Sequence, residues 1–285
     1  LTERGFPNTA TLLGEIVHQP EGGEAQVLAV LQAYVAGEGD AWTFTLSFLQ
    51  RAADEIGHEG GRGDDLLQPY LGFATQLGRR LGEMHRVLAG ESADAAFAPR
   101  RAGREDLDVW RRRIGGRVEA TLSALAARRD ALPEDERVRA GQILMRRAAI
   151  AAEAVRLIVA GEGALLHRIH GDFHLGQVLV ANGDAVIIDF EGEPSLTVAE
   201  RRASDSGWRD VAGILRSLDY AVRVRRRPAR AAGDTRFVEL AEAFAAQVPA
   251  ALLAAYRAGA GQEAVGADTA RDTALLALFL LEKAA

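Results

Sequence analysis

The sequence contains no cysteine, and its only lysine is Lys283. The absence of cysteine excludes disulfide bonds and thiolate chemistry, and it permits a reducing compartment such as the cytoplasm. The net charge is −6, from 34 basic and 40 acidic residues, which argues against a nucleic-acid partner. We find no signal peptide and no apolar run of the roughly 18 residues that a membrane span needs. The sequence therefore predicts a globular, cytoplasmic protein with no membrane or nucleic-acid partner.

The beginning of the chain has the composition of β-strands. Leu12–His18 and Ala25–Val35 are rich in Val, Leu and Ile, and Pro20–Gly23 between them favours a turn. After a glycine-containing break, Asp40 occupies the position of a helix N-cap. From Ala41 the apolar residues recur at three- and four-residue steps, which predicts a helix.

Most of the remaining chain has helical periodicity. Apolar stripes predict helices over Leu66–Ala89, Glu105–Arg129, Thr235–Arg257 and Asp268–Ala285, and Pro133 is expected to open a further helix. With 48% hydrophobic residues among 285, the chain has enough apolar surface for a large core.

One predicted β-hairpin interrupts the helical half. His167–Ile169 reads as a short strand, and Val178–Ala181 and Ala185–Asp189 flank Asn182-Gly183, a strong tight-turn signal. A three-residue loop that includes Asp184 would place Gln177 opposite Asp189. A two-residue loop would place Gln177 opposite Ile188. In both registers the two ends of the hairpin meet.

Polar residues crowd these two ends. His170–Gln177 precedes the hairpin and Ile188–Pro194 follows it. Such a concentration of polar groups beside apolar strands is costly unless the groups are used. Asp172, Gln177 and Asp189 are oxygen donors of the kind that Mg²⁺ and its bound phosphates require. Phosphoryl transfer also needs a carboxylate that accepts the proton of the attacking hydroxyl.

These segments resemble the aminoglycoside-phosphotransferase and protein-kinase-like superfamily. His170–Gln177 resembles its catalytic loop, HGDxxxxN, and Asp189-Phe190-Glu191 resembles its metal-binding DFG-type motif. Bacterial maltokinases, some of them fused to trehalose synthase, give a more detailed match. Their HGDxHLGQVL, IDFEGEP and AERRxxDSxxRDVAGxLRSxDYA patterns are similar to His170–Leu179, Ile188–Pro194 and Ala199–Ala221. Gln177 replaces the superfamily asparagine and agrees with the maltokinase subgroup.

The resemblance implies roles for individual residues. Asp172 would be the catalytic base, and Gln177 and Asp189 the metal ligands. His170 would support the catalytic loop, and Asp210 would brace its backbone, although a helix-capping role also suits Asp210. Backbone groups near Gln32, Ala33 and Tyr34 would contact adenine. Sugar hydroxyls or phosphate charge would be contacted by His174, Glu193, Arg201, Arg202 and Arg216.

The lysine of a kinase-like N-lobe has no counterpart before Lys283. We expect it to lie upstream of Leu1, in a longer polypeptide of which this sequence is a piece. The predicted fold is accordingly α+β and protein-kinase-like. Residues 1–39 would form an incomplete, β-containing N-lobe and the hinge, and residues 40–285 a mainly helical C-lobe with the catalytic hairpin. We expect these residues alone to bind ATP poorly and to turn over negligibly.

The predicted function is an ATP- and Mg²⁺-dependent phosphotransferase acting on a sugar hydroxyl. The resemblance implies conversion of maltose to maltose 1-phosphate, which supplies α-glucan (glycogen) synthesis from trehalose, with a possible fusion to or complex with trehalose synthase. Glucosamine, another sugar or an aminoglycoside is the alternative acceptor. Two other classes stay open. His170, Asp172 and His174 alternate and would bind Zn²⁺ on a strand, as in a hydrolase. The missing lysine would also suit a non-catalytic binding module.

Overall fold

A computed structural model describes residues 1–23, 25–59, 66–231, 235–265 and 268–285 of the chain. Within these residues the fold is mixed but rich in helix, and the strands form two-stranded antiparallel sheets. The strands are β1 Leu12–His18, β2 Gln26–Gln32, β3 Arg100–Arg101, β4 Leu165–Leu166, β5 Val178–Ala181 and β6 Asp184–Ile187. The helices are α1 Ala41–Glu59, α3 Gln68–Leu88, α4 Arg104–Trp110, α5 Gly116–Arg128, α6 Glu134–Met145, α7 Arg147–Ala160, α8 Val198–Arg202, α9 Trp208–Ala231, α10 Thr235–Val265 and α11 Thr269–Ala284.

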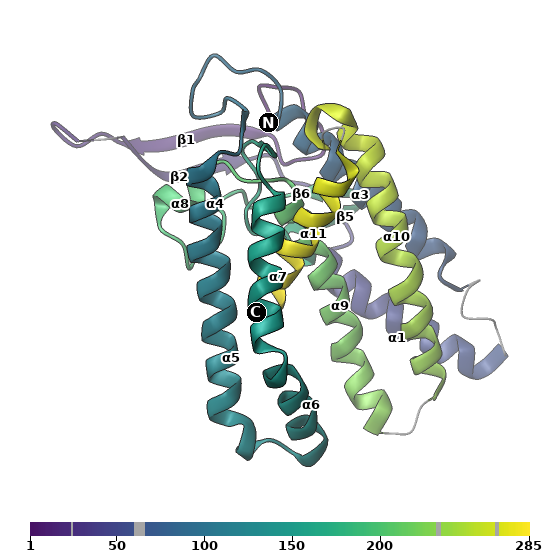
Figure 1. Ribbon diagram of the computed structural model, residues 1–285. Coiled ribbons are helices and arrows are strands. Elements are labelled where there is room, and N and C mark those ends of the chain that lie inside the picture. Colours follow the sequence, from purple (N-terminus) through teal and green to yellow (C-terminus); the bar gives the residue numbers. More distant parts are fainter. Residues whose placement is uncertain (24, 60–65, 232–234, 266–267) are drawn as a thin grey trace.

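The ribbon formed by β1 and β2 extends from one end of the molecule, while helices make up most of the remainder (Figure 1). The segments before β1 and after β2 both run along the hairpin formed by β5 and β6. Thr9 pairs with Ile187 on β6, and Asp40 pairs with Leu179 on β5. The hairpin β5–β6 is thus held on both sides by segments of the N-terminal part of the chain.

Helices α3 and α10 pack closely because small residues line their contact. A Cβ atom added to Gly78 would lie 2.2 Å from the carbonyl oxygen of Leu252, and one added to Gly82 would lie 2.4 Å from that of Tyr256. Only glycine permits this approach of two backbones. The core continues from this pair through α1 and α9.

Helix α10 contains a segment, Phe237–Gly261, that is long and apolar enough by length and composition to cross a membrane. Glu239, Glu242 and Arg257 interrupt it, which is why the sequence contains no uninterrupted apolar run of that length. The helix packs against α3 and α9 in the structure, as expected for a core helix of a globular protein.

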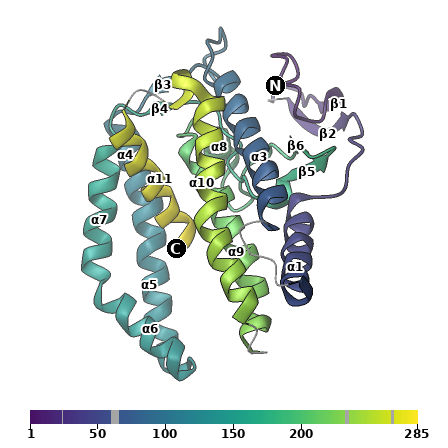
Figure 2. The same ribbon diagram turned by 90° about the vertical axis from the view of Figure 1, so that its right-hand side faces the viewer.

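Helices α5, α6 and α7 form one side of the helical body, and α11 lies between them and α9 (Figure 2). The predicted helix over Glu105–Arg129 is interrupted, because Arg111–Gly115 forms a π-helical turn between α4 and α5. This turn directs Ile114 into the core and Arg113 towards α11. Helix α11 therefore connects α5, α6 and α7 with α9.

Candidate active site

The segment between β4 and β5 is a loop, and hydrogen bonds of the His170 ring help to fix its conformation. The His170 ring donates from Nε2 to the carbonyl oxygen of Ile188 (2.9 Å), and its Nδ1 accepts from the backbone N–H of Asp172 (3.4 Å). Gly171 has a φ of +86°, a left-handed conformation that favours glycine. Gly213 of α9 lets the helix approach this loop, since a Cβ there would lie 2.4 Å from the carbonyl oxygen of Phe173.

The buried carboxylate of Asp210 holds the loop through two hydrogen bonds. Its two carboxylate oxygens accept from the backbone N–H groups of His170 (2.7 Å) and Gly171 (2.9 Å), and the residue is 1% exposed. His85 donates from Nε2 to Asp210 (3.1 Å), and its Nδ1 accepts from the hydroxyl of Tyr256 (3.0 Å), with the tautomer assigned from these partners. Burial opposes ionisation of Asp210, but the hydrogen bonds from His85 and from the Gly171 N–H lower its pKa to about 2.

We expect Asp210→Asn to destabilise the fold by about 2 kcal/mol, because hydrogen bonds to a buried charge contribute about 1.5–3 kcal/mol each. An amide has one acceptor oxygen, so one loop N–H would face an N–H₂ group. Urea unfolding measures the loss. Asp219→Asn on the same helix, where the carboxylate pairs with Arg216 and Arg223 at the surface, is the control and should cost less than about 1 kcal/mol. Equal losses in the free energy of unfolding for the two substitutions would contradict the role of Asp210 in holding the loop.

The hairpin β5–β6 has the two-residue turn. Ala181 pairs with Asp184 across Asn182-Gly183, and Gln177 therefore faces Ile188, whose N–H donates to the Gln177 carbonyl (3.0 Å). The two polar ends still meet, because the Gln177 amide donates from Nε2 to Oδ2 of Asp189 (2.9 Å). Asp189 is exposed and has a φ of +62°, an uncommon conformation for a residue with a side chain. Strain of this kind is concentrated at functional sites.

A cavity of about 650 Å³ opens beside the loop. Its lining includes Asp172 and His174, with Asp172 Oδ2 3.9 Å from His174 Nε2, and Arg216 of α9. Lys283 also lines this cavity. A second cavity of about 540 Å³, between β4 and α11, contains none of the groups that the sequence pattern singles out, so we assign the site by its chemistry to the first.

Four other candidate residues lie outside the lining of this cavity: Ala33, Tyr34, Arg201 and Arg202. Arg201 of α8 donates to the carbonyl oxygen of Glu191 (3.3 Å), and the carbonyl oxygen of Arg202 accepts from Arg168. Ala33 donates its N–H to Thr11 (2.8 Å) at the end of β2, and the Tyr34 ring is 92% exposed. The contacts predicted for these residues, with adenine for Ala33 and Tyr34 and with the acceptor or phosphate for the two arginines, stay predictions.

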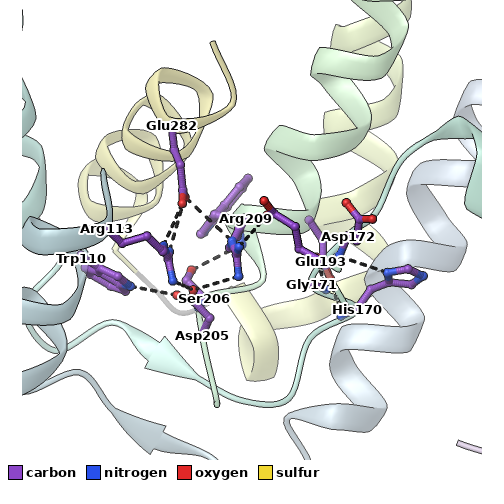
Figure 3. A network of polar contacts seen from close by, with 12 residues as sticks. Trp110, Arg113, His170, Gly171, Asp172, Glu193, Asp205, Ser206, Arg209 and Glu282 are labelled. Carbon is purple, nitrogen blue, oxygen red and sulfur yellow. Dashed lines mark hydrogen bonds and ion pairs between the residues drawn. The ribbon is translucent and has the colours of Figure 1, made fainter. Parts of the chain in front are cut away.

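Glu193 belongs to a network of charged side chains rather than to the cavity (Figure 3). Its oxygens face Arg117 (2.9 Å), Arg209 (3.2 Å) and Lys283 (3.7 Å). Burial opposes its ionisation, but these cations and a hydrogen bond from Ser195 lower its pKa to about 2. With every oxygen occupied, Glu193 fastens the segment after Asp189 to the helices.

The network continues into the interior. Arg113 pairs with Asp205 (2.9 Å) and Glu282 (2.8 Å), and Trp110 donates from its indole N–H to Asp205 (2.9 Å). This network joins the π-helical turn, the loop before α9 and helix α11, beside the loop of His170 and Asp172 (Figure 3). Such buried networks fix one arrangement of their elements only when their members are paired.

Residues 49–192, half of the chain, match the model of a phosphotransferase enzyme family. The chain belongs to this family. The match contains the loop of Asp172 and the whole hairpin, and it ends just after Asp189-Phe190-Glu191.

Two curated relatives of this phosphotransferase are glucosamine kinases. The one from Streptacidiphilus jiangxiensis is 31% identical over 204 residues, which are 72% of this chain and 41% of that protein. The one from Mycolicibacterium smegmatis (strain ATCC 700084 / mc(2)155) is 27% identical over 255 residues, which are 87% of this chain and 53% of that protein. The chain thus spans about half the length of the curated relatives it matches.

A solved glucosamine kinase in complex with glucosamine, ADP and inorganic phosphate superposes with a TM-score of 0.74 at 26% identity, covering 98% of this chain and 62% of that one. A second crystal form gives a TM-score of 0.73. The predicted α+β, protein-kinase-like fold is therefore confirmed. Membership of the maltokinase subgroup stays a prediction, since the relatives carry another name.

The local structure does not support the predicted zinc triad. The segment with His170, Asp172 and His174 is a loop, so alternation along a strand does not place the three side chains together. Both ring nitrogens of His170 are used within the loop, and His174 Nδ1 accepts from the N–H of Gly176 (3.0 Å). Among the described residues, no group of three or more His, Cys, Asp or Glu side chains is arranged to hold a metal.

The buried residue His167, which precedes the loop of Asp172, predicts a pH dependence of stability. Burial and the neighbouring His85 lower its pKa from 6.5 to about 4. As the pH falls from 6.5 to 4, the unfolded chain takes up a proton that the folded chain does not, so the folded state loses about 3 kcal/mol. Burial raises the pKa of Asp272 to about 6, which acts in the opposite direction over the same interval. We expect His167→Gln to remove the His167 contribution, so that the free energy of unfolding rises relative to the wild type as the pH falls towards 4. The same pH dependence in the variant as in the wild type would assign it to other groups.

Proposed function

We propose that the protein transfers the γ-phosphoryl group of ATP to a hydroxyl of a sugar. The observation that carries this proposal is the position of Asp172. It lines a cavity from the braced loop, and the hairpin that follows this loop brings Gln177 and Asp189 together. A base and a pair of oxygen donors are the two parts that phosphoryl transfer requires.

In the proposed reaction the acceptor hydroxyl occupies the cavity against Asp172. Its oxygen forms the new bond to the γ-phosphorus as the bond to the β–γ bridging oxygen of ATP breaks, and Asp172 accepts its proton. ADP leaves with the charge of the broken bond. The products are ADP and a sugar phosphate, and the proton passes from Asp172 to solvent.

The donor set at the hairpin mouth fits Mg²⁺. Asp189 offers a carboxylate and Gln177 an amide oxygen, and phosphate oxygens and water usually complete the coordination of this ion. When bound, Mg²⁺ supplies charge neutralisation of the phosphates. The hydrogen bond from Gln177 Nε2 to Asp189 keeps the two side chains adjacent, but it uses the amide nitrogen, so the amide must turn over before its oxygen can share an ion with Asp189.

We propose glucosamine as the first acceptor to test, since both curated relatives and the superposed crystal structure carry that name. Maltose, implied by the maltokinase-like motifs, is the second. A cytoplasmic location, where ATP is available, and an association with trehalose synthase are further parts of the proposal.

The acceptor is tested by measuring kcat/KM of the full-length protein for glucosamine, maltose and an aminoglycoside at fixed ATP and Mg²⁺. We expect one sugar to be preferred by at least about tenfold, which corresponds to about 1.4 kcal/mol. Activity on the aminoglycoside alone would contradict a sugar kinase. Binding of a sugar without phosphoryl transfer would favour the non-catalytic module.

A further inference from the structure

The lining of the cavity beside Asp172 contains an aromatic pair as well as polar side chains. Trp42, in the first turn of α1, and Tyr220 of α9 both line it, and their rings stack with centroids 5.6 Å apart and planes inclined by 25°. The pair joins two helices that are distant in the sequence. It lies in the same cavity as the side chains that a reacting hydroxyl would meet.

The exposure of the two rings is unusual for a pair that serves only packing. Tyr220 is 54% exposed, and Trp42 is half-buried. The other tryptophans, Trp110 and Trp208, are only 2% and 3% exposed. A stack that merely sealed α1 against α9 would be expected to bury both rings, as the core aromatic contacts of Tyr70 and Phe244 are buried.

We infer that the Trp42–Tyr220 pair is a platform on which the apolar face of the acceptor sugar lies. This inference rests on the proposed function and adds the side chains that select a ring-shaped acceptor. A pyranose ring presents C–H groups on its faces and hydroxyls around its edge. Aromatic rings offer apolar area to the face while leaving the edge free for hydrogen bonds.

Polar groups in the same lining suit the edge of such a ring. Asp172 and His174 lie where phosphoryl transfer is proposed, whereas Arg216 pairs with Asp219 (2.6 Å) and Lys283 lies 3.7 Å from Glu193. An apolar lining with a few polar groups is the usual construction of a small-molecule site. Asp40, which also lines the cavity, is engaged as the cap of α1 through Thr43 (2.8 Å) and is not assigned to the sugar.

The platform predicts a preference for cyclic acceptors. An open-chain polyol has the same hydroxyls but no flat apolar face, so it would gain little from the two rings. Sorbitol is therefore expected to bind at least about tenfold more weakly than the accepted sugar. The same difference should disappear when the platform is removed.

The test combines kinetics with tryptophan fluorescence of the full-length protein. Within this chain Trp42 is the one tryptophan at the cavity, so a sugar-dependent change in emission that is absent in Trp42→Phe reports this site. Tyr220→Ala is expected to raise KM for the accepted sugar about tenfold and to leave kcat within about threefold. Tyr220→Phe, which keeps the ring, should behave as the wild type.

Val224→Ala is the matched control, since this residue is an exposed apolar side chain one turn further along α9 and outside the cavity lining. An unchanged KM in Tyr220→Ala, with phosphorylation intact, would overturn the platform and leave the proposed function standing. If the wild type phosphorylates none of the sugars, the proposed function fails, and the fluorescence titration decides the platform alone. A sugar-dependent signal lost in Tyr220→Ala would then support it, and no signal with glucosamine or maltose would overturn it.

Discussion

Replacing Asp172 by asparagine is expected to lower the rate of sugar phosphorylation by about 10²–10⁴-fold, the usual contribution of a positioned base. Asparagine keeps the size of the side chain but cannot accept the proton of the attacking hydroxyl. The loop should keep its conformation, because its hydrogen bonds run through the backbone N–H of residue 172 and through His170, Gly171 and Asp210. The effect should thus fall on kcat, while KM for ATP and for the sugar changes little.

Asp130→Asn is a suitable control, since it removes an exposed carboxylate beyond the end of α5. Turnover of this variant should equal that of the wild type. If an Asp172→Asn variant shown to be folded by circular dichroism kept wild-type turnover, Asp172 would lose the role of base.

Replacing Asp189 by alanine is expected to abolish the Mg²⁺-dependent part of ATP binding. Loss of a group that merely supports a metal ligand costs about 10–100-fold in affinity, so loss of the charged ligand itself should cost at least as much. Gln177→Ala should weaken binding less, because a neutral amide gives up less charge attraction. Calorimetric titration of ATP with and without Mg²⁺ separates the metal-dependent part.

Asp130→Asn is again the control, since it removes an exposed carboxylate outside the motif of Asp189. Its ATP affinity should be that of the wild type. Equal losses for Asp189→Ala and Asp130→Asn would point to the net charge of the protein rather than to coordination. Activity supported by Zn²⁺ in place of Mg²⁺ would argue for the hydrolase class.

The elements that the sequence predicted well are those whose signals are local. The hairpin turn at Asn182-Gly183, the strands of the first ribbon and the helix starting at Ala41 each depend on residues a few positions apart. The loop with Asp172 and the mouth with Asp189 are close in the sequence because a hairpin connects them. Local patterns were therefore sufficient to bring the central groups of the site together.

The supporting residues are distant in the sequence and left no such signal. His85 reaches Asp210 from 125 positions away, and it resembled an ordinary residue on an apolar helix face. Arg113 and Glu282 are 169 positions apart, and their pairing depends on a π-helical turn that interrupts a regular helical pattern. The predicted strand at His167–Ile169 is wrong, since Leu165–Leu166 pairs with Arg100–Arg101 instead and His167 makes only an isolated bridge to Asp205.

Glu193 illustrates why chemistry alone does not place a residue. Its position in a motif next to Asp189 suggested contact with the substrate, yet three cations from separate helices surround it. Arg117 comes from a segment 76 positions away, and Lys283 lies near the end of the last helix, so only tertiary packing brings them together.

The central claim is that this loop and hairpin transfer a phosphoryl group to a sugar rather than to water. Phosphorus NMR of the full-length protein with ATP, Mg²⁺ and the preferred sugar measures ADP, sugar phosphate and inorganic phosphate in one sample. We expect one sugar phosphate for each ADP, little inorganic phosphate, and loss of both products in Asp172→Asn. Inorganic phosphate formed in step with ADP, with no sugar phosphate at any sugar concentration, would contradict the claim.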